Sequence, residues 1–542
     1  MALSLGMSAV SYGTRILADK VCKAGVFSCS FGEAIQATTG TFPPDFSART
    51  CAEYDGLYFD PQHNYAILVI TALFAALMAF AIGGNDGANA WGTVIHSFAI
   101  RFQPAVILGT IFEVLGATTI GYGVSGSIQT GITKLQNPDC FACGYCNSSM
   151  TLYYMGMMAA LISASIFILA ATMLKMPVST SHTIVSSVFG MTVVFGGFGC
   201  ADFGFDNLGG VIASWFISPL AAGVITVIVY HFLQRFIFQA RNPRERAYVI
   251  VPVLYFLVMF VIVMISYLKA PVLEHKPRWQ GVAVGLAGGV LMMLIYLFMI
   301  FPRLRDNLPS LSSANRIGAD VMDFDDVEQY TANNDDMDLK AVNGDGFLDA
   351  EVERPSLVLL DEYDALTPDQ QDAMYLFKHL LVLVACLQSF SHGSNDTANA
   401  TAALSAVING FKHGINDCAD PESPWWIMLI GGLFIGLGIW VIGQKVMDTI
   451  GKNISVVTFD RAFATEFSSA ITVVVCSLLD VNVSTTHCQV GAVIFISMAA
   501  KESDMIQWKL VCFILLSWLL TLPLSAGLAA LIAYVLKFSV KM

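Results

Sequence analysis

Charged residues are scarce in this sequence of 542 residues: Asp, Glu, Lys and Arg make up 13%, while 56% are hydrophobic and the mean hydropathy is +0.65. So little charge cannot cover the surface of a water-soluble protein of this length. The sequence also lacks a basic patch interleaved with aromatic residues, which excludes nucleic acid as a partner. The composition therefore predicts an all-α polytopic protein whose partner is a lipid bilayer.

Two further absences narrow the function. No Ser-His-Asp order and no paired metal site is present, so we expect no enzymatic activity and no cofactor. Residues 1–64 lack the long apolar core of a signal peptide, and we interpret them as an extracellular arm. The net charge of −13 is not spread over the chain, because the stretch from Arg316 to Asp372 holds 17 acidic and 3 basic side chains. This stretch is predicted to form a loop outside the membrane.

One motif occurs twice, each time after a long apolar run: Gly-Gly-Asn-Asp-Gly-Ala-Asn-Ala from Gly83 to Ala90 and Gly-Ser-Asn-Asp-Thr-Ala-Asn-Ala from Gly393 to Ala400. An acidic residue at membrane depth marks a functional site. Two such residues in matching frames predict one site built from both halves. Because Gly, Ala and Asn dominate the first unit, we expect the helix to break there and to expose main-chain groups.

A second motif also recurs, as Pro-Val-Ser-Thr-Ser-His from Pro177 to His182 and Asn-Val-Ser-Thr-Thr-His from Asn482 to His487. A short apolar run follows each copy, which is typical of a hairpin or half-helix. Since several landmarks recur in one order, the chain contains an internal repeat.

The number of spans gives the topology. Each half contributes five crossings if the short run counts as one, and a linking pair brings the total to about twelve. An odd number per half makes the second repeat inverted. The arginine-rich loop from Arg241 to Arg246 lies in the cytoplasm by its charge, which places both termini outside. The predicted parts are an extracellular arm (1–64), a first transport repeat (65–234), linking helices (235–301), an acidic cytoplasmic loop (302–373) and a second, inverted transport repeat (374–542).

The repeated residues indicate ion chemistry. The Asn-Asp units supply hard oxygen ligands that suit Na+ or a proton; these are Asn85, Asp86, Asn89, Asn395, Asp396 and Asn399. The hydroxyl clusters supply donors beside helix breaks, where the positive end of a helix favours a small oxyanion; these are Ser179, Thr180, Ser181, Ser484, Thr485 and Thr486. Without Lys or Arg, such a site needs a bound cation to hold its anion, which is a physical route to symport.

The same motif residues could instead have purely structural roles. A single Asn-Asp pair can cap a helix, and Ser/Thr clusters can pack membrane helices together. Glu113 and Glu466 lie within spans but follow their Asp by 27 and 70 residues, so they are not equivalent in the repeat. Each either acts at the site or satisfies a broken helix. His182 and His487 are interpreted as helix-cap or neighbouring donors rather than as ligands.

The two Asn-Asp units resemble the duplicated signature of the PiT family of inorganic phosphate transporters, whose usual form is Gly-Ala-Asn-Asp-Val-Ala-Asn-Ala. The two hydroxyl stretches are similar to that family's motifs as well. The resemblance covers Tyr65 to Gly199 and Tyr375 to Leu536. This sequence departs from the family pattern at Gly84, Gly87, Ser394, Thr397 and Asn482, the last of which replaces the second-half Pro.

The resemblance implies a secondary active symporter that imports inorganic phosphate with Na+, in preference to H+, by alternating access. It also implies a homodimer, and we expect the plasma membrane as its location. Implied phosphate contacts are Asn85, Asp86, Ser179, Thr180, Ser181, Asn395, Asp396, Ser484, Thr485 and Thr486. Implied cation-binding or coupling residues are Asp86, Asn89, Glu113, Asp396, Asn399 and Glu466, with sodium at Asp86, Asn89, Asp396 and Asn399. The alternatives are a symporter of sulfate or another oxyanion, and a phosphate sensor with little transport.

The topology also predicts a redox environment. Seven cysteines fall outside, where disulfides persist if that side is oxidising; they are Cys22, Cys29, Cys51, Cys140, Cys143, Cys146 and Cys418.

Overall fold

The computed structural model describes residues 61–308, 365–413, 423–447, 458–500 and 508–539, with short gaps in the first and third ranges. Within these ranges every named element is a helix, and the one isolated bridge joins Thr133 to Ala201. Ten helices are long and apolar enough to cross a membrane, and two apolar helices are shorter. The predicted all-α polytopic fold is confirmed. Most of the predicted arm and of the acidic loop lies outside the described residues.

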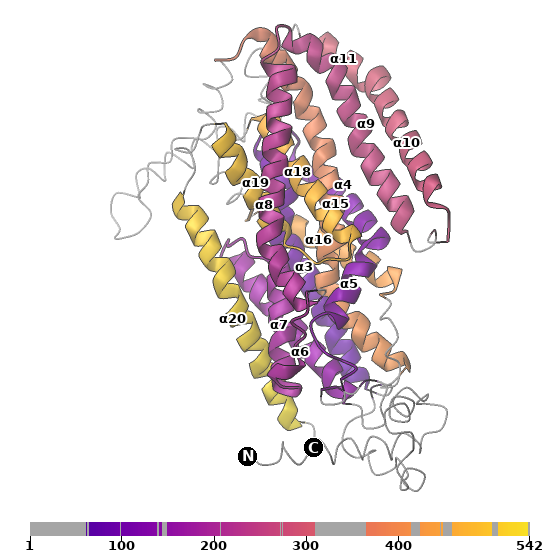
Figure 1. Cartoon of the computed structure of the whole chain (residues 1–542), viewed down its shortest axis with the longest axis vertical. Coiled ribbons are helices and arrows are strands. Elements are labelled where there is room, and N and C mark those ends of the chain that lie inside the picture. The colour runs from indigo at the N-terminus through magenta and orange to yellow at the C-terminus, as the bar shows by residue number, and fades with distance from the viewer. Residues whose placement is uncertain are drawn as a thin grey trace.

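The helices follow one another along the chain in the order shown in Figure 1. The first half contains α3 (Tyr65–His96), α4 (Phe102–Thr119), α5 (Gly121–Thr130), α6 (Met150–Met173), α7 (Thr180–Phe195) and α8 (Leu208–Leu233). The linking helices are α9 (Pro243–Lys269), α10 (Arg278–Ile295) and α11 (Phe301–Asn307). The second half contains α15 (Pro368–His413), α16 (Trp425–Gly438), α18 (Phe459–Leu478), α19 (Thr485–Ala499) and α20 (Trp508–Ser539).

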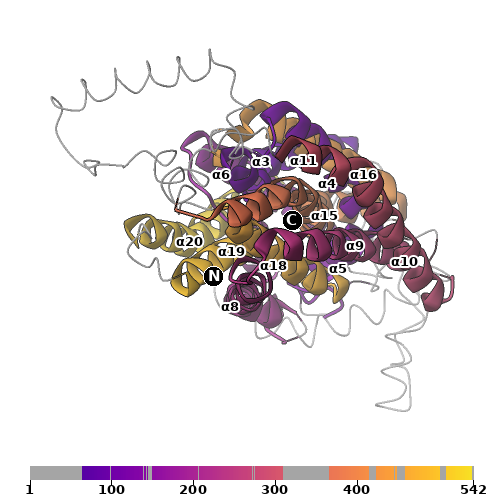
Figure 2. The same cartoon turned by 90° about the horizontal axis from the view of Figure 1, so that it is seen from above.

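The two halves interlock rather than stand side by side. Helix α7 packs on α20 from the other half, and α19 packs in the same way on α8. Helix α3 likewise contacts α16, while α15 contacts α4. The pair α9 and α10 lies on one flank of the bundle, opposite α20 (Figures 1 and 2). Each half therefore needs helices of the other to bury its own.

Helices α3 and α15 run antiparallel to each other. Near the start of α3 the Tyr65 ring lies 5.1 Å from the ring of Phe411, close to the end of α15. Further along α3, Trp91 Nε1 donates to Ser389 Oγ at 2.8 Å, more than twenty residues earlier in α15. The two Asn-Asp units consequently enter the middle of the bundle from opposite directions.

Both of these helices continue through their Asn-Asp units, so the predicted break in the first unit is wrong. The glycines there serve close packing. A Cβ added to Gly83 would lie 1.9 Å from the carbonyl oxygen of Ile435 on α16, and one added to Gly393 would lie 2.1 Å from that of Glu113 on α4. Small residues let membrane helices approach to main-chain contact, which requires no interruption of the helix.

The breaks lie instead before the hydroxyl clusters, where they were also predicted. Two residues after the last residue of α6 and of α18, Lys175 and Asp480 each have a positive φ, of 60° and 56°. The N–H groups of Met176 and Val481 each donate back to a carbonyl of the preceding helix, at 2.9 and 3.0 Å. The two breaks thus repeat in main-chain conformation as well as in sequence.

A disulfide joins Cys140, before α6, to Cys200, just after α7. Disulfide bonding was predicted for the side of the membrane that holds Cys140, but Cys200 was not among the cysteines placed there. The bond fixes the far end of the short helix α7 to the scaffold.

Candidate functional site

The starts of the two short helices form the centre of the site. Ser179 is the N-cap of α7 and accepts a hydrogen bond from the His182 N–H, and Ser484 caps α19 in the same way through His487, both at 3.2 Å. The first two amides of each helix have no partner within the helix, and the macrodipole is positive at this end. Since Ser181 Oγ donates to the Val483 carbonyl at 2.9 Å, the two helix starts lie against each other.

The two repeated carboxylates reach these helix starts. Thr180 donates its hydroxyl proton to Asp86 Oδ2 at 2.7 Å, and Thr485 donates to Asp396 Oδ2 at 2.8 Å. Hydrogen bonds also cross between halves, because Thr486 donates to Asp86 at 3.2 Å and Thr180 also lies 3.1 Å from Asp396. The structure therefore brings both halves together in one site, as the duplicated motif indicates.

The second asparagine of each unit also lies in this network. Asn89 Nδ2 donates to Thr486 Oγ1 at 2.9 Å. Asn399 Nδ2 donates to Asp396 Oδ1 at 2.6 Å and to Ser181 Oγ at 3.1 Å. Both side chains therefore reach hydroxyl groups of the other half, and Asn399 links them to a carboxylate.

The first asparagine of each unit differs between the halves. Asn85 Nδ2 donates to Thr172 Oγ1 at 3.1 Å and to the Met176 carbonyl at 2.9 Å, while its Oδ1 accepts from the Val178 N–H at 3.0 Å. These bonds hold the break before α7 against α3. Asn395, by contrast, is fully buried and has no hydrogen-bond partner among the described residues. Asn85 thus positions the hydroxyl cluster, whereas Asn395 keeps its amide available.

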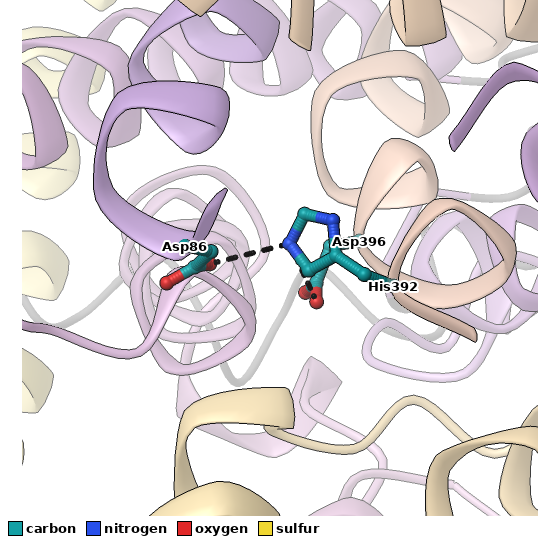
Figure 3. Close-up of side chains that lie close together, drawn as sticks. All are labelled: Asp86, His392 and Asp396. Carbon is teal, nitrogen blue, oxygen red and sulfur yellow. Dashed lines mark ion pairs between the residues drawn. The ribbon is translucent and has the colours of Figure 1, made fainter. Parts of the chain in front are cut away.

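A histidine that the sequence interpretation missed lies between the carboxylates (Figure 3). His392 Nε2 is 3.4 Å from Asp396 Oδ2 and 3.9 Å from Asp86 Oδ2, and its Nδ1 is 2.6 Å from Glu113 Oε1. Asp86, His392 and Asp396 each offer a ligand atom within 4.8 Å of the others. The sequence feature that could have indicated His392 is its position as a polar residue in an apolar run, one helical turn before Asp396. The first half has Ile82 at that place, so the repeat gave no pair to notice.

The two glutamates occupy different places, as their unequal spacing predicts. Glu113 lies on α4 and reaches the site through His392. Glu466 lies on α18, where its Oε1 accepts from Gln489 Nε2 at 2.8 Å and from the hydroxyl of Thr93. Glu466, on α18, therefore links α3 to α19 through side-chain hydrogen bonds.

The two motif histidines form an aromatic cluster behind the helix starts. The ring centroids of His182 and His487 lie 4.3 Å apart, and these rings lie tilted against those of Trp215 and Trp518, at 3.9 and 3.7 Å. Only their main-chain N–H groups take part in capping. The rings pack the two short helices against α8 and α20.

The site is closed. Every predicted site residue, the two glutamates included, is at most 2% exposed. A buried pair of carboxylates beside hydroxyl donors and helix starts can bind a cation and an oxyanion together. Because no residue of the set faces solvent, exchange of either ion requires the helices to move.

A polytopic helical fold with a closed polar site between two interlocked halves is the architecture of a membrane transporter. Comparison with known families then gives the particular identity. The phosphate transporter family matches residues 53–529, and the chain belongs to that family. The protein is therefore an integral, multi-pass membrane protein of phosphate transport.

Individual relatives agree. The chain is 30% identical over 473 residues to the protein named inorganic phosphate transporter 2-1, chloroplastic, of Arabidopsis thaliana, covering 86% of this chain and 71% of the relative. It is 25% identical to sodium-dependent phosphate transporter 1-A of Danio rerio, covering 87% and 95%. A solved structure titled "The sodium-dependent phosphate transporter" matches with a TM-score of 0.68 and 28% identity, covering 87% of this chain and 99% of that one.

Proposed function

We propose that the protein is a symporter that imports inorganic phosphate together with Na+ by alternating access. The observation that carries the proposal is the pair of mirrored hydrogen bonds, Thr180 to Asp86 and Thr485 to Asp396, at the meeting point of two helix starts. Two similar proteins carry sodium dependence in their printed names, which supports the choice of Na+.

The anion would bind at the helix starts. First-turn amides supply neutral donors, and such donors at a helix N-terminus suit a phosphate-sized oxyanion. The hydroxyls of Ser181 and Thr486 would join them on giving up their bonds to the Val483 carbonyl and to Asp86. An ionised carboxylate can only accept hydrogen bonds, so Asp86 and Asp396 would repel a fully deprotonated anion. A phosphate that still carries a proton can donate it to one of them, which sulfate cannot do.

The cation would make this arrangement possible. A buried, uncompensated charge is costly, so two aspartates beside an anion require positive charge nearby. Na+ takes hard oxygen ligands, which Asp86, Asn89 and Asp396 offer, while the Asn399 oxygen accepts a hydrogen bond from Asn482. Binding of the two ions is then mutually dependent, which is the basis of symport.

The helix arrangement supports alternating access. Antiparallel α3 and α15, and short helices that meet start to start, are the relations that an inverted repeat of about twelve segments produces. The closed site would then open to one side or the other as one group of helices rocks against its counterpart.

Radiolabelled phosphate uptake into proteoliposomes tests the proposal, with an imposed Na+ gradient, an imposed pH gradient, or neither. Concentrative uptake under the Na+ gradient alone is expected. Uptake driven only by the pH gradient would identify H+ rather than Na+ as the coupling ion. Phosphate binding without uptake under either gradient would favour a sensor.

A further inference from the structure

The two halves differ at one position of an otherwise mirrored helix break. Pro177 precedes the first hydroxyl cluster, and Asn482 takes its place before the second. The breaks share their main-chain conformation, since Lys175 and Asp480 have φ of 60° and 56°. The carbonyl of each position also accepts from a serine of the partner half, Ser517 for Pro177 at 3.5 Å and Ser214 for Asn482 at 3.3 Å. The difference between the halves is thus confined to the side chain.

That side chain reaches the ion-binding network. Asn482 Nδ2 donates to Asn399 Oδ1 at 3.0 Å, and both residues are fully buried. The orientation of both amides follows from Asp396. Since the Asn399 amide lies 2.6 Å from a carboxylate oxygen, its NH2 must face Asp396 and its oxygen must face Asn482, which then has to donate.

The equivalent oxygen in the first half is not used in this way. Asn89 Oδ1 is buried and has no hydrogen-bond partner among the described residues. Pro177 carries no side-chain donor that could supply one. A buried, unpartnered amide oxygen next to a carboxylate is a ligand position for a hard cation.

His392 adds to the same asymmetry. It lies nearer to Asp396 than to Asp86, at 3.4 and 3.9 Å, and the first half has Ile82 at the corresponding place. The second half therefore supplies two of its own nitrogen groups, from Asn482 and His392, around Asp396 and Asn399. The first half has Pro177 and Ile82 at these two positions, so it places no such nitrogen groups around Asp86 and Asn89.

We propose that Asn482 sets the cation dependence of this transporter: its amide occupies the Asn399 oxygen and so withholds that oxygen from the cation, whereas the Asn89 oxygen of the first half stays available. This inference rests on the proposed Na+ coupling. Asn482 would act as a specificity-determining residue through Asn399, without contact with phosphate. A chain with Pro at this position would offer an additional oxygen ligand to the cation.

The test compares wild type with Asn482→Pro, Asn482→Ala and the reciprocal variant Pro177→Asn in proteoliposomes. The readout is phosphate uptake against Na+ concentration. Both Asn482 variants free one ligand, so the Na+ concentration for half-maximal uptake should fall about three- to tenfold and the Hill coefficient should rise. Pro177→Asn should raise that concentration, because the mirrored break would aim its amide at Asn89 as Asn482 is aimed at Asn399. A merely structural role would not produce opposite shifts.

Thermal unfolding of each purified variant shows whether it folds, and Ala is the fallback if Pro is not tolerated. Folded Asn482 variants with unchanged or raised half-maximal Na+ would overturn the inference alone, provided that wild-type uptake depends on Na+. Wild-type uptake without any Na+ dependence would overturn the proposed coupling and this inference with it.

Discussion

Thr180, the first residue of α7, donates its hydroxyl proton to Asp86 on α3 at 2.7 Å, within the same half of the protein. The same hydroxyl lies 3.1 Å from Asp396 of the other half. One side chain thus touches both repeated carboxylates. The start of α7 and the two aspartates therefore form one hydrogen-bonded unit, and a substitution at any of them should alter the hydrogen bonds of the others.

Removal of this hydroxyl should weaken phosphate uptake. Thr180→Val keeps the shape of the side chain but removes the donor, and we expect the KM for phosphate to rise about tenfold, with a similar effect for Thr485→Val. Initial rates of uptake in proteoliposomes measure this. Thr192→Val is the matched control, because Thr192 lies on α7 but bonds Thr133 near its far end. A KM that rises equally in the control would refute a specific role for Thr180.

Asp86→Asn should change selectivity as well as rate. The amide removes the acceptor that a protonated phosphate needs and also the repulsion toward sulfate, so uptake should fall at least about tenfold and sulfate should compete better. Phosphate uptake with sulfate as competitor gives both quantities. Asp306→Asn, a change in an exposed ion pair with Arg305, is the control and should leave both unchanged. Unchanged selectivity in Asp86→Asn would show that the carboxylate does not accept a hydrogen bond from protonated phosphate.

Asn85 and Asn395 should behave differently although they share a motif position. Asn85→Ala breaks three hydrogen bonds at the helix break, and leaves buried groups unpaired, so the free energy of unfolding should fall by about 1–3 kcal/mol. Asn395→Ala removes an unpartnered amide and should leave stability nearly unchanged, while impairing uptake. Thermal unfolding and uptake of both variants separate the roles. Equal destabilisation would contradict this assignment.

His392 and Glu113 should act as one energetic unit. A double-mutant cycle of His392→Ala and Glu113→Gln, measured by unfolding, should give a coupling of about 1–3 kcal/mol because the pair is buried and 2.6 Å apart. The exposed pair Arg305 and Asp306 is the control, with at most about 0.5 kcal/mol expected. Strict additivity at His392 and Glu113 would mean that the contact contributes nothing.

Much of the fold could be predicted because apolar spans and duplicated motifs have clear patterns. The span from Leu208 to Leu233 matches α8, and the breaks before Ser179 and Ser484 lie where Pro and hydroxyl residues indicated them. The break expected in the first Asn-Asp unit was wrong because glycine in a membrane helix can either interrupt the helix or allow close packing against a neighbouring helix. Only the position of Ile435 on α16 shows that Gly83 serves packing.

The site could be predicted mainly where the two halves agree; Glu113, an acid buried in an apolar span, is the exception. Reasoning from a repeat selects what occurs twice, and it found both aspartates and both hydroxyl clusters. His392 occurs in one half, opposite Ile82, and the partner of Asn482 becomes visible only in three dimensions. The asymmetric residues are the ones that a comparison of halves cannot reveal.

Equilibrium binding of labelled phosphate to the purified protein, with and without Na+, tests most directly whether one buried site holds the anion only together with its cation. Na+ should tighten phosphate binding about tenfold or more, and phosphate should tighten Na+ binding by the same factor. Equal phosphate affinity in the presence and absence of Na+ would contradict this prediction.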